Sequence, residues 1–182
     1  MYNQFFKPFP TISAPRITLR RITMSDLTPL YDACSDPSSS RYSGWYPHVD
    51  KSDTAAFIRY LNKCYRRNKL FTFGIIENKL GFLIGTISVV NINPEYTIAE
   101  IGYTVSSKYR RKGYASESVR ALIDYLVKVV GIKRVEAKVL PENEASRKLL
   151  ESLGFKIEAF QKNGAVIRGE IKDCCLYSYI PE

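Results

Sequence analysis

Residues 108–117 read KYRRKGYASE, and the rest of the chain is best interpreted outward from this stretch. Four of its first five residues are basic, Gly113 follows them, and small residues then lead into an amphipathic run that extends to about Val130. The spacing predicts a turn that enters a helix near Gly113. The first turn of a helix carries backbone N–H groups without intrahelical partners and the positive end of the helix dipole, so this geometry favours an anion.

Gly113 and Ala115 lack the bulk that would keep a phosphate away from those backbone groups, and Arg110, Arg111 and Lys112 add positive charge around them. The spacing matches neither the GxxxxGK[ST] of a nucleoside-triphosphate loop nor the GxGxxG of a dinucleotide fold. Taken alone, the short pattern Arg110-x-x-Gly113-x-Ala115 fits an anion site and a solvated basic turn equally well.

Strand and helix patterns alternate on both sides of this turn. Upstream we expect a strand at residues 12–23, a helix at 25–35 entered through Ser25 or Asp26, and a helix at 52–67 opened by Ser52 and Asp53. Three antiparallel strands are expected to follow, at residues 70–77, 81–92 and 97–105. Turns are expected at Asn78 and at residues 93–95. Downstream we expect a helix at residues 113–130, a strand at 134–140 and a helix at 143–154 that is closed by Gly154. Two closing strands are expected at residues 155–160 and 165–180. This order predicts one α/β domain with a central mixed, mostly antiparallel sheet flanked by helices.

Composition agrees with a single globular domain. The chain has 182 residues, of which 45% are hydrophobic and 25% charged. Lys and Arg total 27 against 18 Asp and Glu, which gives a net charge of +9. Such an excess favours an anionic ligand or an acidic or nucleic-acid partner, but it does not choose among them.

The cysteines show no metal-binding spacing, and the single histidine adds too little for a Cys/His zinc site, so we expect no metal. The chain contains no apolar run of eighteen residues, and MYNQFFKPFP lacks the pattern of a signal peptide. We therefore expect a cytoplasmic protein with reduced thiols and no membrane partner.

A second motif lies at residues 143–155, where NEASRKLLESLGF forms an Asn-x-x-Ser helix that ends in Leu-Gly-Phe. It resembles the second signature of the GNAT superfamily of N-acetyltransferases, and the Arg-x-x-Gly-x-Ala turn resembles that superfamily's acetyl-CoA pyrophosphate loop. Four further stretches look like the RimJ/RimL branch, the ribosomal-protein and small-amine acetyltransferases: PRITLRRIT, AEIGYTV, KGYASES and KDCCLYSYI. One departure is visible, because Arg111 stands where this branch often has glycine.

The resemblance covers nearly the whole chain and implies a single GNAT-like domain over residues 1–182, with acetyl-CoA as the acetyl donor. It implies that the pyrophosphate binds the turn formed by Arg110, Arg111, Lys112, Gly113, Tyr114, Ala115 and Ser116. The pantetheine arm would lie between the splayed strands 97–105 and 134–140, the fourth and fifth of the GNAT fold, with a backbone N–H between Tyr103 and Val105 facing the thioester oxygen.

Acetyl transfer needs a base, because a primary amine is mostly protonated at pH 7. Glu100 is the first candidate, acting through water, and Glu136 and His48 are alternatives. In this branch Asn143 and Ser146 are expected to line the cofactor sulfur, with Ser146 donating to the leaving thiolate. Asn143 would serve equally well as a helix cap, and the two roles are compatible.

The acceptor is expected to be a protein N-terminus or a small-molecule amine, bordered by Trp45 and His48 in the aromatic loop 36–50 and by Tyr177 or Asp173 in the closing strand. No cysteine lies in a recognisable nucleophile setting, which favours direct attack in a ternary complex. Two alternatives remain: an RNA- or ribosome-binding module using the scattered basic residues, and a CoA-binding sensor without catalysis. A C-terminal edge strand also suggests pairing in a homodimer.

Overall fold

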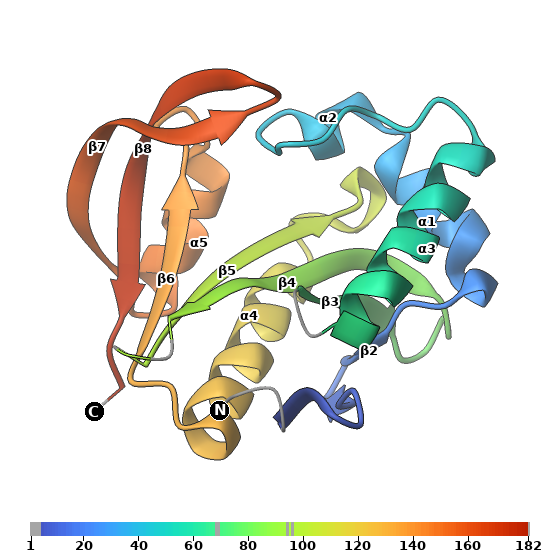
Figure 1. Ribbon diagram of the computed structural model, residues 1–182, viewed down its shortest axis with the longest axis horizontal. Coiled ribbons are helices and arrows are strands. Elements are labelled where there is room, and N and C mark those ends of the chain that lie inside the picture. The colour runs from blue at the N-terminus through green and yellow to red at the C-terminus, as the bar shows by residue number, and fades with distance from the viewer. Residues whose placement is uncertain (1–4, 68–69, 94, 96, 182) are drawn as a thin grey trace.

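The apolar segments at residues 71–77 and 83–93 form neighbouring antiparallel strands in the middle of the molecule. The computed structural model describes residues 5–67, 70–93, 95 and 97–181. Within those residues, eight strands form one open sheet in the order β1-β2-β3-β4-β5-β6-β8-β7 (Figure 1). The strands are β1 Ile12–Ser13, β2 Ile17–Arg21, β3 Phe71–Glu77, β4 Leu83–Asn93, β5 Ile98–Val105, β6 Arg134–Val139, β7 Lys156–Ile167 and β8 Glu170–Tyr179.

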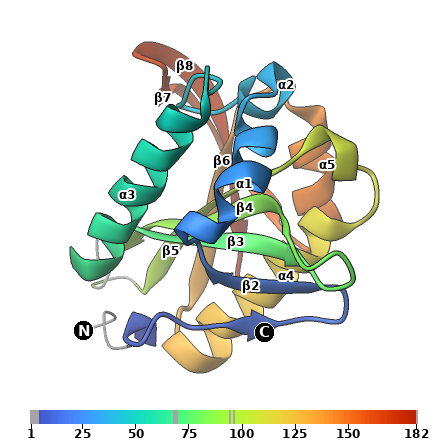
Figure 2. The same cartoon turned by 90° about the vertical axis from the view of Figure 1, so that its right-hand side faces the viewer.

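Helices cover both faces of the sheet (Figure 2). On one face, α1 Leu27–Cys34 and α3 Lys51–Arg67 bury Leu30, Ile58 and Leu61 against the sheet. On the other face, α4 Tyr114–Tyr125 and α5 Glu144–Ser152 contribute their buried stripes to the larger core cluster. A short helix, α2 Pro37–Ser40, lies in the loop after α1. The predicted class, a mixed and mostly antiparallel sheet flanked by helices, is confirmed.

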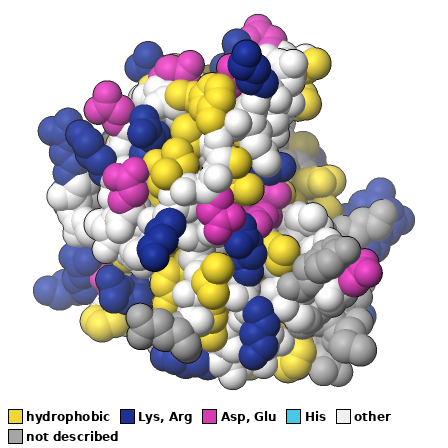
Figure 3. All heavy atoms as spheres, turned by 90° about the vertical axis from the view of Figure 1, so that its left-hand side faces the viewer, with side chains coloured by type: hydrophobic (Ala, Val, Ile, Leu, Met, Phe, Trp, Pro, Cys, Tyr) yellow, Lys and Arg dark blue, Asp and Glu magenta, His cyan; other side chains and the backbone are white. Residues whose placement is uncertain are grey.

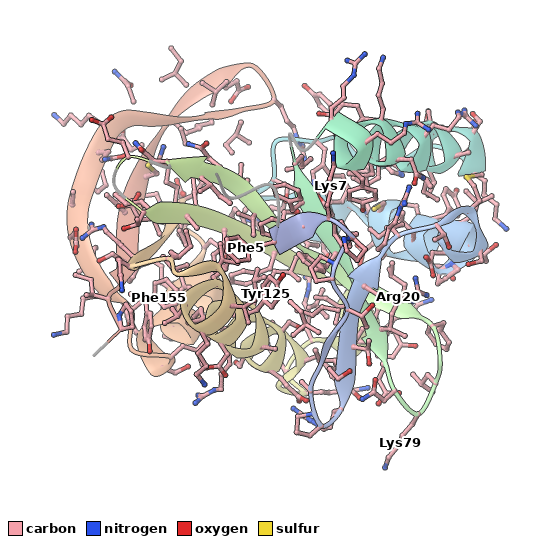
Figure 4. All side chains as sticks on the ribbon, turned by 60° about the horizontal axis from the view of Figure 1, so that its bottom comes forward. Phe5, Lys7, Arg20, Lys79, Tyr125 and Phe155 are labelled. Atoms are coloured by element: carbon pink, nitrogen blue, oxygen red, sulfur yellow. The ribbon has the colours of Figure 1, made fainter. Side chains whose placement is uncertain are left out.

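The segment before β1 is tied to α4 and to the central sheet. Phe6 stacks on Phe71 with ring centroids 3.8 Å apart, and the Tyr125 hydroxyl donates a hydrogen bond to the Phe5 carbonyl. Figure 4 shows Phe5 and Tyr125 next to each other at the α4 side of the sheet. The N-terminal segment therefore closes the core at the end of α4.

The junction of β5 and β6 is the only parallel pairing in the described sheet, and it is short. Pairing runs from Ile98 with Arg134 to Glu100 with Glu136 and then stops. Both strands continue beyond that point, β5 paired on its other side with β4 and β6 with β8. Their facing edges separate, which leaves backbone donors and acceptors directed into the gap.

The two closing strands form one hairpin whose turn is not where the sequence suggested. The expected break at residues 161–164 lies inside β7, and the expected strand 165–180 is divided by a turn at Arg168 and Gly169, with φ of 53° and 80°. Two successive positive φ values are those of a primed hairpin turn. Asn163 and Gly164 look like a turn in the sequence but form an irregularity of β7, where the register shifts and Asn163 has φ of 56°.

Helix ends also differ in detail from the expectation. The helix after the basic turn is α-helical to Tyr125 and continues as a π-helical turn, Leu126–Val130, before Gly131 ends it with φ of 83°. Asp26 precedes α1, but its side chain makes no capping bond to that helix. Its carboxylate instead accepts the Thr23 N–H at 2.9 Å and pairs with Arg20 at 2.8 Å. Burial opposes the charged form of Asp26, but these hydrogen bonds outweigh it and lower its pKa.

Several other expectations meet the structure here. All four cysteines are free and buried. No described helix has both the length and the apolar character needed to cross a membrane. The expected turn at residues 93–95 includes Pro94, and the stretch MYNQFFKPFP includes residues 1–4; these lie outside the described residues. Strand β7 is an outer strand of the sheet, and pairing through it in a homodimer stays a prediction.

Gly85 allows β4 to approach the C-terminal end of β5, because a Cβ at this position would lie 2.4 Å from the Thr104 carbonyl oxygen. That oxygen belongs to the backbone and cannot move cheaply. We expect Gly85→Ala to lower the free energy of unfolding by about 1–3 kcal/mol, measured by urea denaturation. Gly44→Ala is the matched control, since a Cβ there meets nothing within 4 Å. Equal stability of the two variants would contradict the close approach.

Candidate active site

A cleft of about 1190 Å³ occupies the gap between the diverging ends of β5 and β6. It extends from the start of α4 to the hairpin β7–β8 and is bordered by the loop around α2 and by the start of α5. Most of the predicted site residues line it: Trp45, Glu100, Tyr103, Val105, Arg110, Arg111, Gly113, Tyr114, Ala115, Ser116, Asn143 and Ser146. Lys112, His48 and Tyr177 are not among the lining residues.

The basic turn forms a row of free backbone donors at one end of the cleft. Arg111 and Gly113 have φ of 59° and 81°, and α4 begins directly after them. Among the described residues, no acceptor takes the backbone N–H groups of residues 111–116; the first such bond runs from Glu117 N to Gly113 O at 3.0 Å. Arg111 thus holds a left-handed conformation that glycine adopts more readily, which explains why glycine is the more common residue at this position of the motif. These features together form a site for an anion.

Arg16, which precedes β2, braces the turn from outside. Its Nε donates to Glu117 Oε2 at 2.7 Å, its backbone N–H donates to Glu117 Oε1 at 2.7 Å, and its Nη1 donates to the Lys112 carbonyl at 2.8 Å. Its guanidinium also lies over the Tyr114 ring at 5.1 Å. A Cβ at Gly113 would come within 2.9 Å of Arg16 Nη2, so Gly113 provides clearance for this brace as well as for an anion.

Two of the three basic side chains of the turn, those of Arg110 and Lys112, contact other residues of the protein. Arg110 donates through Nε to the Val105 carbonyl at 3.0 Å and through Nη2 to the Ser38 carbonyl at 3.1 Å. It therefore ties the α2 segment to the end of β5. Lys112 lies over the Tyr109 ring at 5.4 Å, outside the cleft lining. Of the three predicted cations, Arg111 alone both lines the cleft and makes no hydrogen bond with a described residue.

The middle of the cleft carries two groups of side chains on opposite faces of the sheet. Strand alternation directs Tyr103 toward the face of α4 and α5, where its hydroxyl lies 2.7 Å from Ser146 Oγ. Glu100 is on the other face, with Lys138 Nζ 3.9 Å from its Oε2. Burial raises the pKa of Tyr103 to about 12, against the opposing effect of its Ser146 hydrogen bond, so the phenol stays protonated near neutral pH. Asn143 caps α5, accepting the Ser146 N–H at 3.3 Å.

Comparison with known proteins identifies the family. Residues 16–156 match the model of the acetyltransferase (GNAT) domain. The chain is 34% identical to the N-acetyltransferase p20 of Bacillus licheniformis, over 93% of this chain and 96% of that protein. The chain belongs to the GNAT acetyltransferases. A GNAT-family acetyltransferase structure from Bacillus anthracis aligns with a TM-score of 0.82 at 27% identity, covering 94% of this chain and 98% of that one.

The predicted resemblance to the ribosomal-protein acetyltransferase branch is also confirmed. The [ribosomal protein uS5]-alanine N-acetyltransferase of Escherichia coli is 28% identical over 69% of this chain and 66% of its own length. Enzymes of the GNAT family transfer an acetyl group from acetyl-CoA to an amine, and the donor row at residues 111–116 suits the pyrophosphate of that molecule. No group of three or more His, Cys, Asp or Glu side chains suited to a metal is found among the residues that the structure describes.

Two predicted acceptor residues of this acetyltransferase lie elsewhere. Tyr177 is fully buried between β8 and α5, where its hydroxyl donates to Glu151 at 2.7 Å and accepts from Arg147 Nε at 3.2 Å. Asp173 accepts the Asn163 N–H at 2.9 Å and so supports the irregular part of β7. The expectation that Tyr177 borders the acceptor is therefore wrong, because its side chain is fully buried, whereas that for Asp173 stays a prediction.

The alternative bases are also placed outside the cleft lining of the acetyltransferase. Glu136 accepts from Arg134 Nε at 2.7 Å, in a framework ion pair. His48 lies in the aromatic loop, with Nδ1 2.8 Å from Thr54 Oγ1 and its ring 5.9 Å from that of Trp45. Burial lowers the pKa of His48. Trp45 lines the cleft, and the expectation that His48 and Trp45 border the acceptor stays a prediction.

Sequence reasoning missed Arg168, which joins the tip of the β7–β8 hairpin to the aromatic loop. Its Nη2 donates to the Ser40 carbonyl at 2.5 Å and to Ser40 Oγ at 2.9 Å, and its Nε donates to the Trp45 carbonyl at 3.0 Å. Its guanidinium also lies over the Tyr46 ring at 4.9 Å. The Arg-Gly pair at the true hairpin turn was the available signal, but Asn163 and the glycine after it gave a stronger one. Arg168 thus closes one side of the acetyltransferase cleft.

We expect Arg16→Ala to weaken acetyl-CoA binding by about tenfold, because the turn loses the hydrogen bonds from the Arg16 side chain to the Lys112 carbonyl and the Glu117 carboxylate. Isothermal titration calorimetry with acetyl-CoA measures the change. Arg120→Ala on the exposed face of α4 is the control, since Arg120 makes no hydrogen bond or ion pair with a described residue. An equal loss of acetyl-CoA affinity in both variants would mean that the positive charge of the arginine, rather than its hydrogen bonds to the turn, supports binding.

We expect Arg168→Ala to loosen residues 36–46, because both carbonyl contacts to the hairpin disappear. Hydrogen–deuterium exchange should become faster in that segment and stay unchanged in α4. Lys172→Ala on the same hairpin is the control: Lys172 pairs with Glu170 at the surface and makes no hydrogen bond or ion pair with residues 36–46, all of which the structure describes. Unchanged exchange in residues 36–46 of the Arg168 variant would show that the loop is held by other contacts.

Proposed function

We propose that this acetyltransferase holds the pyrophosphate of acetyl-CoA at residues 110–116 and transfers the acetyl group directly to an amine in a ternary complex. The observation that supports this most strongly is the row of free N–H donors at residues 111–116, which leads into the gap between β5 and β6. Pyrophosphate needs such donors, and an extended pantetheine arm can bond the unpaired strand edges in the gap. Backbone N–H groups between Tyr103 and Val105 would then stabilise negative charge on the thioester oxygen.

Glu100 is our proposed general base. It lines the cleft on the face opposite Ser146, and its carboxylate accepts no hydrogen bond from a described residue. An acceptor ammonium that enters on this face would meet Glu100 and lose its proton to it, through a water molecule where the distance requires one. The neutral amine can then add to the face of the planar thioester carbonyl that is turned toward Glu100.

Ser146 and Tyr103 are our proposed donors to the leaving thiolate. Their hydroxyls lie 2.7 Å apart on the α5 side of the gap, and the raised pKa of Tyr103 keeps its proton available. If Tyr103 donates to Ser146, the Ser146 proton is free to face the sulfur. Glu100 and the hydroxyl pair then act at opposite ends of the same reaction, one removing a proton and the other supplying it.

The acceptor is an amine, either a protein N-terminus or a small molecule. The relative from Escherichia coli is named for the alanine of a ribosomal protein, which supports the first class. The RNA-binding alternative depends on net charge, but basic and acidic side chains are interspersed on the face drawn in Figure 3. Arg16, Arg110 and Arg168 moreover use their charge inside the fold.

The test is CoA release from acetyl-CoA with a panel of amino acids, amines and short peptides. We expect Glu100→Gln to lower kcat/KM by about 10²- to 10⁴-fold and to remove the acidic limb of its pH profile, with acetyl-CoA binding unchanged. Ser146→Ala should lower kcat while the KM for the acceptor stays nearly the same. Lys79→Met, at an exposed turn, is the control. Acetyl-CoA binding without release in the wild-type protein would instead support a sensor.

A further inference from the structure

Lys138 is a cleft-lining cation that the proposed mechanism does not use. It follows Glu136, the last residue of β6 that pairs with β5, by two positions and therefore projects from the same face of the sheet. Glu100 projects from that face of β5 across the gap. The side chains of Lys138 and Glu100 are 38% and 27% exposed, so both are reachable from the cleft.

Lys138 and Glu100 form an ion pair without a hydrogen bond between them. Lys138 Nζ lies 3.9 Å from Glu100 Oε2, beyond hydrogen-bond distance, and neither group has a hydrogen bond to another described residue. The framework pairs of this protein close fully, with 2.7 Å for Arg16 and Glu117 and 2.8 Å for Arg20 and Asp26. The Lys138–Glu100 pair therefore keeps hydrogen-bonding capacity on both partners, directed toward the cleft.

Lys138 and Glu100 are the charged side chains of the described cleft lining at this end, and the Asp173 carboxylate lies nearby outside that lining. Among the described lining residues, the remaining charged side chains are Arg110 and Arg111, both at the anion turn. The neighbours of the pair in the lining are Ser88, Val90 and Cys174, which carry no charge at neutral pH. A ligand in this region thus meets one negative and one positive group side by side.

We propose that Lys138 selects the acceptor by binding a carboxylate that lies one or two carbons from the reacting amine. This inference depends on the proposed function, in which Glu100 receives the amine. An amino acid carries its ammonium and its carboxylate as close neighbours, so it can pair with Glu100 and Lys138 at once. The amide of the same amino acid lacks the negative charge and leaves Lys138 without a partner.

The chemistry of transfer is unchanged by this contact. The acceptor ammonium loses its first proton through Glu100 to solvent, and the neutral nitrogen then bonds to the acetyl carbon. The carbon–sulfur bond breaks, the second amine proton passes to Glu100, and the thiolate takes a proton from Ser146, which regains one through Tyr103 from solvent. Lys138 touches the acceptor and takes no part in the proton transfers. It is therefore a specificity-determining residue, and its loss should change KM for the acceptor more than kcat.

The experiment compares kcat/KM for the twenty L-amino acids with that for their α-amides. We expect the wild-type protein to prefer the acid of a matched pair by about 10- to 100-fold. Lys138→Met should bring that ratio close to one, mainly through KM for the acid, whereas Lys138→Arg should keep most of it. Aspartic acid α-amide distinguishes binding of a side-chain carboxylate from binding of an α-carboxylate, since it retains only the side-chain carboxylate.

Lys79→Met is the matched control, because Lys79 projects from the β3–β4 turn away from the sheet (Figure 4). It should leave the acid-to-amide ratio as in the wild-type protein. Acetyl-CoA affinity, measured by calorimetry, should be the same in all variants and shows that each is folded.

Equal use of acids and amides by the wild-type protein, or a ratio that survives in Lys138→Met, would overturn the inference. Transfer to amines that carry no carboxylate, without transfer to any amino acid, would overturn it as well and would leave the proposed function intact. Failure to bind acetyl-CoA or to release CoA with any amine would overturn the proposed function itself.

Discussion

The end of hydrogen bonding between β5 and β6 is the constraint on which the rest of this protein depends. A parallel pair that continued past Glu100 and Glu136 would fill the gap and satisfy the backbone groups that now face it. Because the strands separate, the sheet bends into two parts, as Figure 1 shows, and a cleft passes between them. Tyr103 and Glu100 reach this cleft from opposite faces of the sheet.

Arginine contacts stabilise the walls of this cleft. Arg16 holds the turn before α4, Arg110 ties the α2 segment to the end of β5, and Arg168 ties the hairpin to the aromatic loop. Each guanidinium donates to backbone carbonyls of a loop that has no ladder partner. Buried or partly buried carbonyls without partners are costly, so these contacts support irregular segments where the chemistry requires them. Part of the +9 charge is therefore structural.

The order of the elements was predictable because it depends on local periodicity. The apolar stripe of α4, the Asn143 cap and the end of α5 at Gly154 all follow from neighbouring residues. The hairpin turn was misplaced for the same reason: Asn163 and Gly164 carry the stronger local signal, yet the register with β8 makes them an irregularity of β7. Pairing across the sheet, which a local pattern does not contain, decided that position.

By itself, the sequence determined the fold class, the family and the turn at residues 110–116, because these depend on periodicity and on short spacings within one segment. Only the tertiary structure decided that Tyr177 is a core residue and that the Tyr103 hydroxyl contacts Ser146. It also decided that Lys138 lies near Glu100 without a hydrogen bond to it. Those relations join residues that are far apart in the chain. Their physical cause is the packing of strands and helices from different segments, which sets the face and the neighbours of each side chain.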